Sequence, residues 1–124
     1  MGKAILAALL AAALAKLFVF DVVIADGNSM EPTIRSGSVL IVNRLSYGLR
    51  LPGRGDFLVR WGSPADGDVV VFRTPGGAHA VKRARTLPCG NFMVLGDNRA
   101  LSLDSRSFGP VPADAAIGRV VGVR

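Results

Sequence analysis

Short runs of apolar and β-branched residues, separated by turn residues, follow one another along most of this chain. The run Val69-Val70-Val71-Phe72 is apolar at every position, which predicts a strand buried on both faces. The glycine-rich region 47–55 predicts a loop. Further strands are predicted over 38–43, 78–85, 91–95 and 117–123. This pattern is typical of a mainly β fold, and we expect a small coiled sheet or partly open β-barrel.

The first 21 residues carry a different pattern, an apolar stretch with basic residues near its start and end. Lys3 precedes the uncharged run 4–15, and Lys16 lies between that run and a second apolar run that ends at Asp21. The segment has three interpretations: a cleavable signal peptide, a membrane anchor or a soluble helix. A soluble helix is disfavoured, because the alanines and leucines leave no polar face.

Between the other two interpretations, the sequence favours a retained anchor over residues 1–21. Cleavage after Ala15 would leave the apolar stretch 17–25 at the new terminus, with no linker behind it. A helix from Lys3 to Asp21 would be about 27 Å long, close to the roughly 30 Å of a bilayer's hydrocarbon core. We therefore expect one N-terminal transmembrane helix in the cell membrane, followed by an extracytoplasmic domain over 22–124.

The composition narrows the possible classes of protein. The chain has 124 residues, half of them hydrophobic and 19% charged, which fits one small ordered domain with a short appendage. Its formal charge of +6 is spread along the sequence, which favours a basic surface near lipid headgroups over a nucleic-acid site. Cys89 stands alone, and no cluster of histidines, cysteines or carboxylates suggests a metal, so we expect no metal and no cofactor.

Ser29, in the motif Gly27-Asn28-Ser29-Met30-Glu31-Pro32-Thr33, is a candidate nucleophile, but a serine hydroxyl needs a base beside it. His79 lies three residues before Lys82, and in a strand these two side chains point to opposite faces. Lys82 shares its face with Ala80 and Ala84, where loss of water favours the neutral amine. His79 shares its face with arginines. This pattern favours a serine–lysine pair over a Ser-His-Asp triad.

Five segments of the chain, in order, resemble type I signal peptidases, the membrane-anchored serine–lysine endopeptidases. They are the N-terminal anchor and the segments 28–33, 67–72, 80–83 and 96–106, and together they cover most of the chain. The resemblance implies that the protein removes signal peptides from exported preproteins after small residues. It also implies that Ser29 attacks the scissile carbonyl to form an ester, and that Lys82 is the general base for both steps.

The resemblance further implies how the substrate is held. Asn28, Met30 and Ala80 are the expected substrate-binding residues. The signal peptide would lie extended between the segments 21–28 and 79–82, adding a strand to the sheet. The pockets of the site would accept small side chains of the signal peptide, usually alanine. The expected partners are thus preproteins and the lipid bilayer, with no nucleic acid.

Four residues match the family's supporting positions: Asp97, Ser102, Asp104 and Arg106. The last three lie two residues apart, so an extended chain would place them on one face. Ser102 would then hydrogen-bond to Lys82 and orient it, while Asp104 and Arg106 would pair to hold their segment in place. Asp97 is expected to support a turn.

Two departures from the family pattern bear on the expected activity. Many relatives carry a hydroxyl two residues before the nucleophile, where this chain has Gly27, so the Ser29 backbone N–H would do more of the work of the oxyanion hole. The usual β insertion after the lysine strand is reduced to about 86–93. Two alternatives stay open: a specialised relative that matures one pilin-like or conjugation protein, and a non-catalytic, membrane-tethered β domain.

Overall fold

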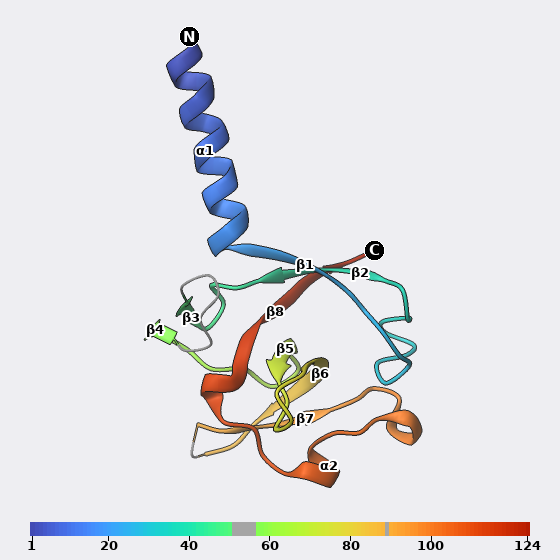
Figure 1. The fold of residues 1–124 in the computed structure, drawn as a ribbon. Helices are drawn as coiled ribbons and strands as arrows, with labels where there is room; N and C mark the ends of the chain where they lie inside the picture. The colour runs from blue at the N-terminus through green and yellow to red at the C-terminus, as the bar shows by residue number, and fades with distance from the viewer. Residues whose placement is uncertain (51–56, 89) are drawn as a thin grey trace.

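The computed structural model describes residues 1–50, 57–88 and 90–124 (Figure 1). In these residues six strands form an antiparallel sheet in the order β1-β2-β8-β5-β6-β7, and β3 pairs with β4 in a second, two-stranded sheet. The strands are β1 (Phe20–Ile24), β2 (Val39–Asn43), β3 (Gly48–Arg50), β4 (Phe57–Arg60), β5 (Val69–Arg73), β6 (His79–Thr86), β7 (Phe92–Leu95) and β8 (Ala116–Val123).

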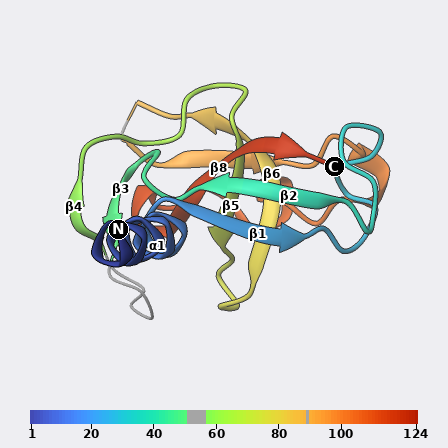
Figure 2. The ribbon, with the colours of Figure 1, turned by 90° about the horizontal axis from the view of Figure 1, so that it is seen from above.

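The predicted mainly β fold is confirmed, but the sheet is not a closed barrel, because β1 and β7 lie at opposite ends of the strand order. Seen from above, β1, β2 and β8 run side by side across the domain (Figure 2). The helical elements are α1 (Gly2–Phe18), α2 (Ser105–Phe108) and two short 3₁₀ helices, Arg99–Leu101 and Ala113–Ala115.

The five predicted strands all form, each within one residue of its expected bounds. The prediction of a loop over 47–55 is wrong for Gly48–Arg50, which forms β3, while 51–56 lie outside the described residues, as does Cys89. A Cβ on Gly48 would meet the backbone of β4. This glycine therefore marks a close approach between two strands rather than a loop.

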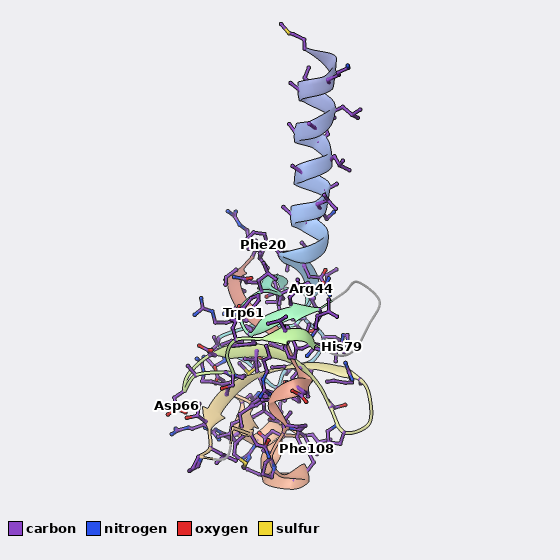
Figure 3. All side chains as sticks on the ribbon, turned by 90° about the vertical axis from the view of Figure 1, so that its left-hand side faces the viewer. Phe20, Arg44, Trp61, Asp66, His79 and Phe108 are labelled. Carbon is purple, nitrogen blue, oxygen red and sulfur yellow. The ribbon has the colours of Figure 1, made fainter. Side chains whose placement is uncertain are left out.

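Helix α1 stands away from the sheet, and the side chains of residues 2–16 project from it without protein cover (Figures 1 and 3). Of the helices that the structure describes, none combines the length and apolarity needed to cross a membrane, so the transmembrane helix expected over 1–21 is not found. The helix ends at Phe18, and β1 begins at Phe20, within the expected anchor. The reason is that 20–24 is rich in β-branched residues, which pair with β2.

Buried side chains form two clusters, one on either side of β5. As predicted, this strand is buried on both faces: Val70 and Phe72 lie in the larger cluster, and Val69 packs against the smaller one. The larger cluster also contains Phe92, whose ring meets that of Phe72 edge-on with centroids 6.4 Å apart. The smaller cluster, built on Met30, Ile34 and Leu40, places the segment after β1 against the sheet.

Candidate active site

Ser29 and Lys82 lie together although 53 residues separate them in sequence, with the lysine Nζ 2.6 Å from the serine Oγ. Ser29 follows β1, and Lys82 lies in the middle of β6. The predicted alternation of faces is confirmed: Lys82 is 7% exposed and Ala84 is fully buried, whereas His79 is exposed (Figure 3). Of the two candidate bases, it is thus the lysine that faces Ser29.

Burial favours the neutral form of the Lys82 amine. The partner of Lys82 on the neighbouring strand β5 is Val70, which is itself fully buried. Loss of water lowers the pKa of the Lys82 amine below its usual 10.5, and the negative charge of Asp104 partly opposes that shift. A lysine with a lowered pKa carries its neutral, basic form at a lower pH than an exposed lysine does, and the neutral form is the one that accepts a proton.

A cleft of about 200 Å³ opens beside this pair, between the end of β1 and the start of β6. Such a volume is below that of sites for drug-sized ligands and suits small side chains. Two of the three expected substrate-binding residues, Met30 and Ala80, line the cleft, but Asn28 does not. The other lining residues are Val23, Ile24, Ala25, Asp26, Gly27, Ser29, Ile34, Val71, His79, Val81 and Lys82.

Ile34 and Val71 are lining residues that the sequence reasoning did not name. Val71 lies in a strand whose neighbouring positions face the core, so its sequence context gives no sign that it borders a cleft. Ile34 follows the Ser29 motif and is 2% exposed, and its contact with the cleft depends on how the segment after β1 folds back. Neither Val71 nor Ile34 therefore carries a sequence signal that marks it as a lining residue.

Gly27 has a backbone φ of +90°, in the region that favours glycine. A Cβ there would meet open space, so conformation rather than crowding restricts this position. The Gly27 N–H donates to Ser36 Oγ at 3.2 Å, which fixes one side of the turn before Ser29. The missing hydroxyl therefore accompanies a backbone conformation that a serine would adopt only with strain.

The Gly96–Asn98 turn packs directly on Asn28 and Ser29. The Asn98 backbone N–H donates to Ser29 O at 2.8 Å, and the Asn98 side-chain amide donates to Asn28 O at 3.0 Å. A Cβ on Gly96 would clash with Ser102 Oγ and would lie 2.6 Å from Ser29 O. Only glycine allows this close approach, so the turn acts as a rigid support behind the serine.

Asp97 fastens the same turn to the sheet. Its carboxylate accepts two hydrogen bonds from Arg83, from Nε at 2.9 Å and from Nη2 at 2.8 Å, and a third from Thr33 Oγ1 at 2.6 Å. These bonds, led by those from Arg83, hold the pKa of Asp97 below its usual value. The Asp97 N–H also donates to the Met30 sulfur at 3.4 Å. Asp97 thus links β6 to Met30 and Thr33 of the Ser29 motif.

Asp104 is fully buried and gathers the remaining supporting residues around its carboxylate. Ser102 Oγ donates to it at 2.8 Å, the Gly96 N–H at 3.0 Å, and Arg106 through Nε at 2.9 Å and Nη2 at 3.0 Å. Burial alone would raise the pKa of this carboxyl, but these donors outweigh burial and hold it far below its usual value. The carboxylate is therefore charged and fully hydrogen-bonded.

Two expectations for this group need correction. Arg106 does not continue an extended chain, because Asp104 caps the short helix α2 by accepting the Arg106 backbone N–H at 3.1 Å. Among the described residues no hydrogen bond joins Ser102 to Lys82, and the Ser102 hydroxyl donates to Asp104. The expected pairing of Asp104 with Arg106 is present at 2.9 Å. Asp104 acts on Lys82 through its charge.

Replacing Asp104 by alanine is expected to lower the free energy of unfolding by about 3 kcal/mol, because the buried Gly96 N–H and Ser102 hydroxyl would lose their acceptor. Urea denaturation of the full chain measures this loss. Asp114 offers the matched control, because its ion pair with Arg60 lies at the surface and its alanine variant should lose less than about 1 kcal/mol. Equal losses in the two variants would contradict this account of Asp104.

The same carboxylate gives stability a definite pH dependence. The folded state lowers the pKa of Asp104 below 3.8, so its contribution is complete above about pH 4 and is lost as the pH falls toward the lowered value.

Comparison with known proteins shows which family the chain resembles. The chain matches the family described as "Signal peptidase, peptidase S26" over residues 1–89 and 77–123. It is 36% identical over 116 residues to the mitochondrial inner membrane protease subunit 1 of Xenopus tropicalis, covering 83% of this chain and 68% of that protein. It is 31% identical over 144 residues to signal peptidase I of Bacillus caldolyticus, and the match covers 85% of this chain and 79% of that protein. The chain therefore belongs to the signal peptidase family, peptidase S26.

Proposed function

We propose that this chain is a membrane-associated serine endopeptidase that removes signal peptides from exported preproteins after small residues, through a serine–lysine dyad. Membership of the signal peptidase family supports the reaction. The observation that carries the proposal is the 2.6 Å approach of Lys82 Nζ to Ser29 Oγ beside a small cleft.

Neutral Lys82 accepts the hydroxyl proton of Ser29 as Oγ attacks the scissile carbonyl carbon. The protonated amine then donates its proton to the nitrogen of the departing mature protein, and the signal peptide stays attached to Oγ as an ester. In the second half, Lys82 takes a proton from water, whose oxygen attacks the ester carbon. Ser29 recovers its hydrogen from the lysine, and the signal peptide leaves with a free carboxylate.

The arrangement of strands supports binding of the substrate as an added strand. β1 is an edge strand, and β7 pairs with β6 only over Arg83–Thr86. The part of β6 before Arg83 thus has backbone groups that no neighbouring described strand occupies on that side. An extended peptide lying between the two edges would pass Ser29, and the adjoining cleft would admit small side chains.

The exposed surface of α1 supports association with a lipid bilayer. Leucine, isoleucine and alanine side chains surround this helix, and no described part of the domain covers them. A helix that is apolar on all sides is stable only where something other than water surrounds it. We place α1 in contact with lipid and the catalytic domain on the extracytoplasmic side of the cell membrane.

The rate of cleavage should rise with pH as Lys82 loses its proton. Because burial lowers the pKa of Lys82, the midpoint of the rise in kcat/KM should lie below 10.5. Replacing Asp104 by asparagine removes the charge that favours the protonated amine, so the midpoint should move to lower pH. The measurement is the pH profile of preprotein cleavage in detergent or vesicles. A midpoint that does not move, or that moves upward, contradicts the proposed electrostatic coupling.

The short connection between β6 and β7 supports the alternative of a specialised relative. The two strands form a hairpin in which the Leu87 N–H donates to Asn91 O at 3.1 Å, so little chain is available there to contact a substrate. Incubation of the solubilised protein with several unrelated preproteins separates the two functions. Cleavage of several supports general signal-peptide removal, whereas cleavage of one kind supports the specialised enzyme.

A further inference from the structure

We propose that Asn98 is a positioning residue that orients the peptide unit between Asn28 and Ser29, so that the Ser29 N–H faces the oxyanion formed during cleavage. The inference rests on the proposed function, in which Ser29 is the nucleophile. It adds a residue outside the lining of the cleft, whose side-chain amide binds the carbonyl oxygen of Asn28.

The evidence begins with two adjacent hydrogen bonds. Asn98 donates its side-chain amide to Asn28 O and its backbone N–H to Ser29 O, at 3.0 and 2.8 Å. It therefore binds the carbonyl groups on both sides of the Ser29 Cα. Residue 98 is separated from residue 28 by 70 positions, so this contact comes from the tertiary fold and not from a local turn.

The planarity of the peptide bond turns the first of these contacts into a constraint on Ser29. In a trans peptide the C=O and the N–H point in opposite directions. Because Asn98 holds Asn28 O on the side of the 96–98 turn, the Ser29 N–H is directed away from that turn. Among the described residues this N–H donates no hydrogen bond, although Ser29 itself is partly buried. A preorganised donor without a partner is what a developing oxyanion requires.

The region before Ser29 explains why such a constraint matters here. Gly27 is exposed, adopts φ +90° and has no side chain to supply a second donor. If the Asn28–Ser29 peptide rotated, its carbonyl oxygen would replace the N–H and would repel the oxyanion. The support behind Asn98 is itself rigid, because Asp97 is bound to Arg83 and Gly96 lies against Ser29 O.

The test replaces Asn98 by aspartate, which has nearly the same shape but lacks the amide donor and repels Asn28 O. We expect kcat for preprotein cleavage to fall by about 10- to 100-fold, with KM within about twofold of the wild-type value. The pH midpoint of kcat/KM should not fall below that of the wild type, because a new carboxylate near Lys82 can only favour the protonated amine. Glutamine at position 98 keeps the donor and should restore part of kcat.

A second readout separates positioning from a merely structural role. A peptide boronic acid ending in alanine forms a tetrahedral adduct with the Ser29 hydroxyl, placing an oxygen where the oxyanion would lie. The aspartate variant should weaken the Kd of this boronate by about the same 10- to 100-fold as kcat, while the Kd of the matching peptide carboxamide stays within about twofold. Asn91→Asp, an exposed change in the β6–β7 connection, is the control and should behave as the wild type.

The results of these experiments test the positioning role of Asn98 separately from the nucleophilic role of Ser29, on which it rests. If the boronate and the carboxamide weaken equally in Asn98→Asp, or if kcat does not change, the positioning role is wrong. If Ser29→Ala cleaves normally, or the wild-type protein forms no boronate adduct, the proposed nucleophile is wrong instead. A selective loss for the boronate, together with an inactive Ser29→Ala, supports both.

Discussion

Replacing Ser29 by alanine is expected to lower kcat/KM for preprotein cleavage by at least about 10⁴-fold, because the ester intermediate can no longer form. The fold should persist. Ser29 is only partly buried, and the one side-chain hydrogen bond described for it is to Lys82, so the free energy of unfolding should change by less than about 1 kcal/mol. Cleavage of a preprotein in vesicles, with sequencing of the product's N-terminus, measures the loss.

Ser63 provides the control for this variant, because it is an exposed serine outside the cleft described beside Ser29. Ser63→Ala should cleave as the wild type does. Substantial cleavage by Ser29→Ala at the same site would contradict the proposed nucleophile. If instead the wild-type protein and both variants are inactive toward every preprotein offered, the non-catalytic, membrane-tethered β domain becomes the better account.

Replacing Lys82 by methionine is expected to lower kcat/KM by at least about 10³-fold without destabilising the protein. Methionine fills a similar space but has no amine that must lose its water on folding. Since burial disfavours the charged amine at this position, the free energy of unfolding should stay equal or rise by about 1 kcal/mol. Activity and stability would thus change in opposite directions, which is expected of a functional group and not of a packing residue.

Arg85 provides the matched control for the lysine, because it lies on the same strand and is exposed. Arg85→Met should leave kcat/KM within a few-fold of the wild type. An active Lys82→Met protein would show that another group takes the serine proton. A variant that loses activity only because it unfolds would place Lys82 among the structural residues.

The parts of the fold that depend on local pattern could be predicted from sequence. Alternation along β6 predicted that Lys82 is buried and His79 exposed, and the unbroken apolar run predicted that β5 is covered on both faces. Strand boundaries that depend on pairing with another strand could not be predicted from sequence. The start of β1 at Phe20 depends on β2, and the pairing of Gly48 depends on β4.

The hydrogen bonds of the supporting residues could not be predicted from sequence either. Sequence spacing suggested an extended face for Ser102, Asp104 and Arg106, but a helix cap forms at Asp104, and the other two converge on its carboxylate. The contact of Asn98 with Asn28 joins two turns that only the packed sheet brings together. Motif and periodicity can identify which residue types are present, whereas their hydrogen bonds depend on long-range geometry.

The most direct test of the serine–lysine dyad is a titration of the Lys82 amine itself. The sequence contains Lys3, Lys16 and Lys82, so NMR of the protein with isotope-labelled lysine gives few signals, and Lys82→Met assigns the relevant one. We predict that Lys82 titrates below 10.5, with the same midpoint as the rise in kcat/KM. A Lys82 amine that titrates at 10.5 or above, or at a pH unrelated to the rise in kcat/KM, would contradict its role as the base for Ser29.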